Sequence, residues 1–187
     1  MRIVGGRYRG HRLAAPADDR VRPTTDRVRE SLFNILAHRS PPVLDGAIVL
    51  DLFAGTGALG LEALSRGAAR AVFVDQDPRS LALVRANVAA LKAEALCEIV
   101  RADAARLAPR PLAATLAFLD PPYGQSLIAP SLAAAADGGW LAEGAFVVIE
   151  LPAAEEPALP PAFSPVDDRR YGATRIICTC YETREVP

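Results

Sequence analysis

The chain has 187 residues, of which 51% are hydrophobic, and its formal net charge is −1 at pH 7. That length and apolar content suit one domain with a large core, and no apolar run approaches the roughly 18 residues of a membrane span. The early arginines are not followed by the continuous apolar stretch of a secretory signal. We therefore expect a soluble, cytoplasmic protein without a membrane partner.

The three cysteines, Cys97, Cys178 and Cys180, do not suggest a metal centre. Their number is odd, no pair has C-x-x-C spacing and no histidine stands near them. We expect ordinary packing thiols and no bound metal.

Residues 1–40 are strongly basic and differ in pattern from the rest. Nine arginines stand against four carboxylates there, a balance of +5, which leaves −6 for the remaining chain. A basic end suggests a polyanionic partner, although a solvated arginine-rich surface explains the charge equally well. Short β-type pieces separated by glycines predict a small hairpin near the start, and a helix is predicted to begin at Thr25 or Asp26. We interpret residues 1–40 as an appendage and residues 41–187 as the main domain.

The main domain alternates apolar runs of strand length with alanine- and leucine-rich stretches of helical spacing. The five apolar runs lie at residues 47–53, 70–75, 95–100, 114–120 and 145–151. Such alternation predicts βαβ units and a mostly parallel α/β sheet with right-handed crossovers. A proline-rich piece at 151–165 breaks the pattern, and a terminal antiparallel pair is predicted to turn near Gly172.

A glycine-rich turn follows the first predicted strand. Gly55, Gly57 and Gly60 spell G-x-G-x-x-G at a strand-to-helix junction, where glycine permits positive φ angles and a close approach to a ligand. About eighteen residues after Gly57, Asp75 ends the second strand. A carboxylate at that spacing can accept hydrogen bonds from a ribose diol.

The glycine turn leaves two ligand classes open, and Asp51 discriminates between them. A dinucleotide would place its pyrophosphate over the helix N-terminus, where a carboxylate at the mouth of the loop would repel it. The same carboxylate would attract the ammonium group of S-adenosylmethionine. Asp103 ends the next predicted strand and could reach an adenine amine, although a helix N-cap fits it nearly as well.

The stretch "LDPPYG" at residues 119–124 ends the fourth predicted strand. Two prolines stop the strand and stiffen the backbone after Asp120, and ligands bind at the carboxyl ends of parallel strands. The Asp120 carboxylate and the Pro121 carbonyl can each accept one N–H of a planar NH₂ group and aim its nitrogen. Tyr123 offers a face on which a flipped base could stack. The alternative is a rigid turn with a structural tyrosine.

At this point the chain resembles a known family. "DLFAGTGALG" together with "DPPY" is similar to class I S-adenosylmethionine-dependent methyltransferases that modify exocyclic amines. "MRIVGGRYRGHRL" and "RPTTDRVRESLFNIL" upstream narrow the resemblance to RsmD-type bacterial methyltransferases, which make N2-methylguanine in 16S ribosomal RNA. The resemblance covers nearly the whole chain and implies a Rossmann-like fold, a mostly parallel seven-stranded sheet with an antiparallel last strand, and a small N-terminal β-hairpin appendage.

The resemblance also implies roles for individual residues. S-adenosylmethionine would be held by Asp51, Phe53, Gly55, Gly57, Asp75, Asp103 and Ala104. The target amine would be held by Asp120, Pro121, Pro122 and Tyr123. RNA would be contacted by Arg7, Arg9, Arg12, Arg22, Thr24, Thr25, Arg27 and Arg29. The implied substrate is the helix 31 loop of 16S ribosomal RNA, in the small subunit or an assembly intermediate, and the enzyme is expected to be a monomer.

Three other functions remain open from the residues. A DNA adenine-N6 methyltransferase also uses D-P-P-Y, but the chain has no room for a separate target-recognition domain. An NAD-dependent oxidoreductase would use the literal glycine motif, but both histidines, His11 and His38, lie in the N-terminal piece. A non-catalytic RNA-binding protein would not need Asp51, Asp75 and "DPPY" together.

Overall fold

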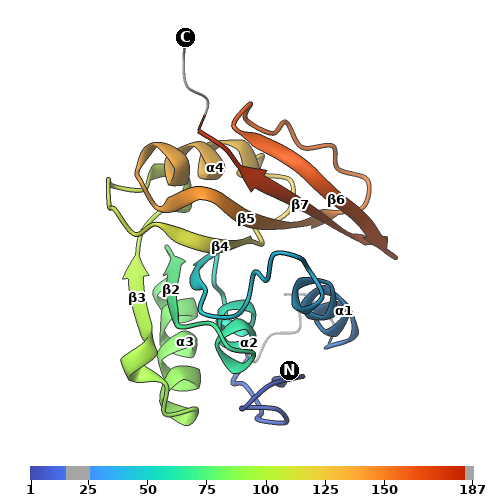
Figure 1. Ribbon diagram of the computed structural model, residues 1–187. Helices are drawn as coiled ribbons and strands as arrows, with labels where there is room; N and C mark the ends of the chain where they lie inside the picture. Colours follow the sequence, from blue (N-terminus) through green and yellow to red (C-terminus); the bar gives the residue numbers. More distant parts are fainter. Residues whose placement is uncertain (16–25, 184–187) are drawn as a thin grey trace.

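The computed structural model describes residues 1–15 and 26–183. Its centre is a seven-stranded sheet in the order β3-β2-β1-β4-β5-β7-β6 (Figure 1). The strands are β1 (Ile48–Leu52), β2 (Arg70–Asp75), β3 (Cys97–Arg101), β4 (Ala114–Leu119), β5 (Leu141–Pro152), β6 (Phe163–Tyr171) and β7 (Thr174–Tyr181). The strands β1 to β5 pair in parallel, and β7 runs antiparallel to both β5 and β6. This confirms the α/β class and the mostly parallel sheet with an antiparallel strand at the end of the chain.

Helices cover both faces of the sheet (Figure 1). The helices are α1 (Asp26–Ala37), α2 (Ala58–Ser65), α3 (Pro78–Ala90) and α4 (Ile128–Asp137), with short 3₁₀ turns at Glu94–Leu96 and Ala104–Arg106. Apolar side chains of α1, α2 and α3 form one buried cluster with one face of the strands. Those of α4 belong to a second cluster on the other face. Both faces of the central strands are therefore buried, as their continuous apolar sequence requires.

Local sequence signals explain where α2 and α3 begin. Gly57 precedes α2 with φ of 77°, a left-handed conformation that favours glycine. Asp77 caps α3 by accepting a hydrogen bond from the Arg79 N–H at 2.8 Å, and Pro78 occupies the first turn. Both helices thus start directly after the carboxyl end of a strand, the edge where ligands bind in such sheets.

The N-terminal segment, residues 1–14, folds back on itself, with the Ile3 N–H donating to the His11 carbonyl at 2.9 Å, but it contains no regular strand. A single antiparallel bridge joins Arg2 and Arg12, so the β-hairpin is not confirmed in that form. Ile3 and Leu13 are buried in the same apolar cluster as the first three helices. The segment therefore packs on the main fold, and the division of the chain at residue 40 stays a prediction.

The three cysteines are free thiols. Burial raises the pKa of both Cys97 and Cys178 to about 12, so these thiols stay protonated at neutral pH and act as packing groups. Within the described residues, no three His, Cys, Asp or Glu side chains gather in a way that could hold a metal ion. No helix in the same part of the chain is long and apolar enough to cross a membrane.

Candidate active site

The carboxyl ends of the central strands bring the predicted site residues to one edge of the sheet. Asp51 in β1 lies opposite Phe73 of β2 and Phe118 of β4 in the strand register. Asp75 is the last residue of β2, and Asp120 directly follows β4. Because side chains two apart on a strand share a face, Phe118 and Asp120 extend the face that carries Asp51. The glycine loop and the D-P-P-Y stretch therefore meet at this edge.

The loop between β1 and α2 turns through several left-handed residues. Phe53, Gly55 and Gly57 have φ angles of 60°, 55° and 77°. Such an angle is unusual for an aromatic residue, and strained backbone of this kind clusters at ligand sites. The structure thus accounts for two of the motif's glycines through backbone conformation, and it adds Phe53 as a third left-handed position.

The third glycine, Gly60, has a different role. Its N–H donates to the Asp51 carboxylate at 2.9 Å. A Cβ added at Gly60 would lie 2.5 Å from the Phe73 ring and 3.0 Å from the Asp51 carboxylate. Glycine is required there because α2 packs closely against β1 and β2.

Asp51 is a buried carboxyl group, 2% exposed, at the mouth of the glycine loop. Burial raises its pKa to about 7, the Gly60 hydrogen bond opposes this rise, and the nearby Asp75 carboxylate adds to it. A buried carboxyl with a raised pKa is poised to gain from a cationic partner, because such a partner favours its ionised form.

Asp75 is held by backbone N–H groups. One carboxylate oxygen accepts from the Gly55 N–H at 3.0 Å and the other from the Asp77 N–H at 2.8 Å. Each oxygen keeps a second acceptor position. Asp75 is therefore oriented by the loop itself and can still accept two further hydrogen bonds, as a diol would offer.

Asp103 adopts the helix-capping role that the sequence left open. Its carboxylate accepts from the Ala105 N–H at 2.9 Å at the start of the 3₁₀ turn Ala104–Arg106. Ala104 is buried beside it. The contact of these two residues with an adenine ring stays a prediction.

The D-P-P-Y stretch presents a carboxylate and an exposed ring. Burial raises the pKa of Asp120 well above its usual value, and the carboxylates of Glu150 and Asp51 raise it further. Pro121 is buried and Pro122 is exposed. Tyr123 is 50% exposed, which is high for a large aromatic side chain. The stretch therefore combines a partly buried carboxylate with a ring that solvent and ligands can reach.

Glu150 is a site residue that the sequence did not single out. It lies near the end of β5, is 5% exposed, and follows Ile149, the register partner of Leu119. It thus stands beside Asp120, and together with Pro121 and Tyr123 it lines a small hollow. A carboxylate near the end of a predicted apolar strand was the available signal, although here the strand continues past it.

The predicted RNA-contacting residues divide into three groups. Arg7, Arg9, Arg12 and Arg27 are exposed. Arg27 also lines an open depression of about 470 Å³ over α1 and β6, away from the glycine loop. Arg22, Thr24 and Thr25 lie outside the described residues.

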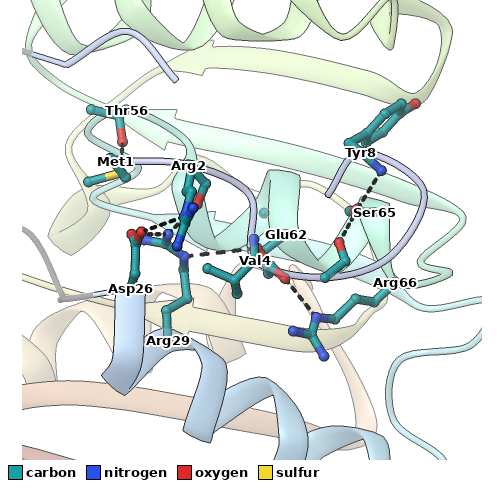
Figure 2. Close-up of polar contacts among 12 residues, drawn as sticks. Met1, Arg2, Val4, Tyr8, Asp26, Arg29, Thr56, Glu62, Ser65 and Arg66 are labelled. Carbon is teal, nitrogen blue, oxygen red and sulfur yellow. Dashed lines mark hydrogen bonds and ion pairs between the residues drawn. The ribbon is translucent and has the colours of Figure 1, made fainter. Parts of the chain in front are cut away.

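Arg29, the remaining residue of that set, was wrongly assigned to RNA. It is 1% exposed and donates to the Arg2 carbonyl and, at 2.8 Å, to the Asp26 carboxylate (Figure 2). Its Nε lies 3.9 Å from the carboxylate of Glu62, which is fully buried. Arg29 therefore joins the N-terminal segment to α1 and α2, and a buried guanidinium cannot meet phosphates.

Comparison with known proteins identifies the family of the chain. The family model described as conserved hypothetical protein 95 matches residues 1–180. The chain is 43% identical over 151 residues to ribosomal RNA small subunit methyltransferase D of Escherichia coli (strain K12), covering 80% of this chain and 74% of that protein.

Solved structures share the fold. The E. coli protein yhhF superposes with a TM-score of 0.84 at 35% identity, covering 98% of this chain and 99% of that one. An RNA methyltransferase from Salinibacter ruber, solved in complex with S-adenosyl-L-homocysteine, has a TM-score of 0.65 at 18% identity, covering 88% and 96% of the two chains; at that identity the likeness concerns the fold. With the glycine loop, Asp75 and the D-P-P-Y stretch on one sheet edge, these matches show that the chain belongs to the conserved hypothetical protein 95 family, the RsmD-type methyltransferases.

Proposed function

We propose that this protein transfers a methyl group from S-adenosylmethionine to the exocyclic N2 amine of a guanine in 16S ribosomal RNA. The observation that carries the proposal is the placement of Asp120 beside the glycine loop, on the sheet face that carries Asp51. The methyl donor and the amine that receives the methyl group must lie close together. This edge of the sheet offers hydrogen-bond acceptors for both molecules. Membership in a methyltransferase family supports the same conclusion.

The residues at the glycine loop fit S-adenosylmethionine, which when bound supplies an electrophilic methyl group on a sulfonium. Asp51 would face the ammonium of its methionine part, which favours the ionised form of a carboxyl whose pKa is about 7. Asp75 would accept from the ribose hydroxyls with its remaining acceptor positions. Phe53, Gly55 and Gly57 would line the loop, with Asp103 and Ala104 near the adenine.

At the other end of the edge, Asp120 would orient the amine. A guanine amine donates two N–H groups, which the Asp120 carboxylate and the Pro121 carbonyl would accept. An amine nitrogen that takes the methyl group, with cleavage of the methyl–sulfur bond, would become more acidic, and an ionised Asp120 with a raised pKa would be suited to take its proton. Pro122 stiffens the loop, and Tyr123 would stack on the base.

RNA would approach over the basic N-terminal segment, where Arg7, Arg9 and Arg12 are exposed, and over Arg27 of α1. Neutralising phosphates makes binding depend on salt. Replacing Arg7, Arg9 and Arg12 with glutamine should flatten the plot of log affinity against log salt by up to about 0.7–0.9 for each phosphate that is no longer neutralised. An unchanged slope would mean that RNA binds elsewhere.

The helix 31 loop, the small-subunit context, the monomeric state and the cytoplasmic location belong to the same proposal.

Two alternatives are less favoured. The family match does not support a DNA adenine-N6 methyltransferase, although D-P-P-Y would serve there. An NAD-dependent oxidoreductase would need a pyrophosphate beside the buried Asp51 carboxyl group, which would be repulsive once that group is ionised.

The decisive experiment is methyl transfer from labelled S-adenosylmethionine to small ribosomal subunits lacking the modification, to naked 16S RNA and to DNA, followed by digestion to nucleosides. We expect label in N2-methylguanosine from a ribosomal substrate. Label confined to N6-methyladenine would refute the substrate while keeping the amine chemistry. An enzyme that labels nothing and binds NAD would refute the proposal altogether.

A further inference from the structure

Asn87 of α3 is a buried amide that holds two separate segments of the chain at once. It is 1% exposed. Its carbonyl accepts from the Ala14 N–H at 2.7 Å, and its amino group donates to the Ala14 carbonyl at 3.1 Å and to the Thr56 carbonyl at 2.9 Å. Two backbone carbonyls and one N–H fix the orientation of the amide, and both of its N–H donors are used.

Thr56 ties the glycine loop to this contact. It stands between Gly55 and Gly57, two of the loop's left-handed residues, and its carbonyl is the one that Asn87 binds. Its hydroxyl donates to the Met1 sulfur at 3.4 Å (Figure 2). The loop that would hold the cofactor therefore touches the N-terminal segment both directly and through Asn87.

The N-terminal segment is also fastened to α2, the helix that leaves the glycine loop. The Val4 N–H donates to the Glu62 carboxylate at 2.8 Å, and the Tyr8 N–H donates to the Ser65 hydroxyl at 2.9 Å (Figure 2). A Cβ added at Gly6 would lie 1.8 Å from the Ser65 carbonyl oxygen. Backbone and helix are thus in close contact, and the segment cannot shift without moving away from α2.

The exposed arginines of this segment lie between Val4, which binds α2, and Ala14, which binds Asn87. Arg7 and Arg9 follow the Val4 contact, and Arg12 stands two residues before Ala14. A phosphate bound to these arginines would restrict the same backbone that Asn87 and α2 hold. A ligand in the glycine loop would restrict the Thr56 carbonyl at the other end of the Asn87 amide.

We propose that Asn87 is a positioning residue that couples RNA binding on residues 1–14 to cofactor binding at the glycine loop, so that each ligand raises the affinity for the other. The inference rests on the proposed function, because it takes RNA and S-adenosylmethionine as the two ligands. Ordering by the first ligand lowers the entropic cost of ordering for the second, and the coupling must be equal in both directions.

The test measures the affinity for S-adenosylhomocysteine, a non-reactive probe, by calorimetry with and without a saturating RNA hairpin that carries the helix 31 loop. In the unmodified protein we expect RNA to tighten probe binding at least about fivefold, and the probe to tighten RNA binding by the same factor. In Asn87→Asp, which keeps an acceptor for Ala14 but loses both donors, the factor should fall to about one. A general loss of stability would weaken each affinity without removing their mutual dependence.

Leu132→Val is the matched control, because Leu132 is fully buried in α4 on the opposite face of the sheet. It should keep the full coupling factor. If Asn87→Asp does not fold, amide hydrogen exchange in the unmodified protein replaces it: the probe should slow exchange at Val4, Tyr8 and Ala14. Unchanged exchange there, or a coupling factor of one in the unmodified protein, would overturn the inference.

Failure of the inference is distinguishable from failure of the proposed function. Methylation of ribosomal RNA together with a coupling factor of one would refute only the role of Asn87. Absence of RNA binding and of methylation in the unmodified protein would refute both.

Discussion

The carboxylates that follow β2 and β4, Asp75 and Asp120, have opposite surroundings. At the end of β2, backbone N–H groups of Gly55 and Asp77 donate to Asp75. At the ends of β4 and β5, Asp120 stands beside Glu150, and burial with neighbouring negative charge raises its pKa. Backbone groups of the chain orient Asp75, whereas Asp120 lies close to another acidic group at an electrostatic cost, as Asp51 does beside Asp75. Such a cost is typical of sites that await a ligand, here one that donates hydrogen bonds.

Asp120→Ala should have the largest effect and tests whether Asp120 acts on the methyl acceptor. Loss of a charged hydrogen bond costs about 1.5–3 kcal/mol, so the methyl-transfer rate should fall about ten- to a hundredfold. Affinity for S-adenosylmethionine should stay nearly unchanged. Single-turnover kinetics and calorimetry measure the two quantities separately, with Glu155→Ala, which lines the neighbouring hollow of Pro121 and Glu150, as a control. Equal losses in rate and affinity would mean that Asp120 acts on the cofactor.

Asp75→Ala should produce the reverse pattern. Affinity for S-adenosylmethionine should fall about tenfold, because the variant loses charged hydrogen bonds to the ribose, while the rate at saturating cofactor changes little. The control is Asp77→Ala, which removes the α3 cap but leaves the Asp75 carboxylate in place. Unchanged calorimetric affinity in Asp75→Ala would refute the ribose contact.

Asp51→Asn should stabilise the folded, ligand-free protein while lowering its affinity for S-adenosylmethionine. The folded-state pKa of about 7 lies above the usual value, so ionising Asp51 destabilises the ligand-free protein as the pH rises from about 4 to about 7. Asparagine avoids that cost, but burying its amide N–H groups offsets most of the benefit. We therefore expect the free energy of unfolding to rise by about 1 kcal/mol at pH 8. Thermal denaturation should show the gain disappearing and turning into a net loss toward pH 4, where the carboxyl is protonated in the folded protein and asparagine avoids no cost. A gain independent of pH would contradict this account.

Glu150→Gln should give the smallest change. Removing its negative charge lowers the pKa of Asp120, because Glu150 raises that pKa. If ionised Asp120 serves in the reaction, the acid limb of the pH–rate profile moves to lower pH while the plateau changes little. A plateau that falls without any displacement of the limb would mean that Glu150 acts through packing.

Sequence patterns predicted the sheet, and the carboxylates that follow its strands, because both depend on local signals. Buried parallel strands are continuous apolar runs, and the carboxylates that end β2 and β4 are visible as breaks in those runs. Glu150 escaped notice because β5 continues past it to Pro152, in contrast with β4, which prolines end directly after Asp120.

Arg29 and Asn87 were beyond prediction for a different reason. An arginine in a basic stretch is normally a surface residue, and nothing nearby in the sequence indicates that Glu62 lies opposite Arg29 in the core. Asn87 sits next to Val88 in an amphipathic helix, and its partners are backbone groups far away in the chain. The attachment of the N-terminal segment to α2 was likewise beyond prediction, because the Val4 and Tyr8 N–H groups bind side chains more than fifty residues away.

The contact between Gly60 and Phe73 changes what the glycine motif says about ligands. A methyl group at position 60 would collide with an aromatic ring and crowd a carboxylate, whatever molecule occupied the loop. The third glycine of the literal G-x-G-x-x-G is thus a requirement of folding and carries no information about cofactor identity. A motif search that scores all three glycines as one dinucleotide signature therefore counts a packing requirement as evidence for a ligand.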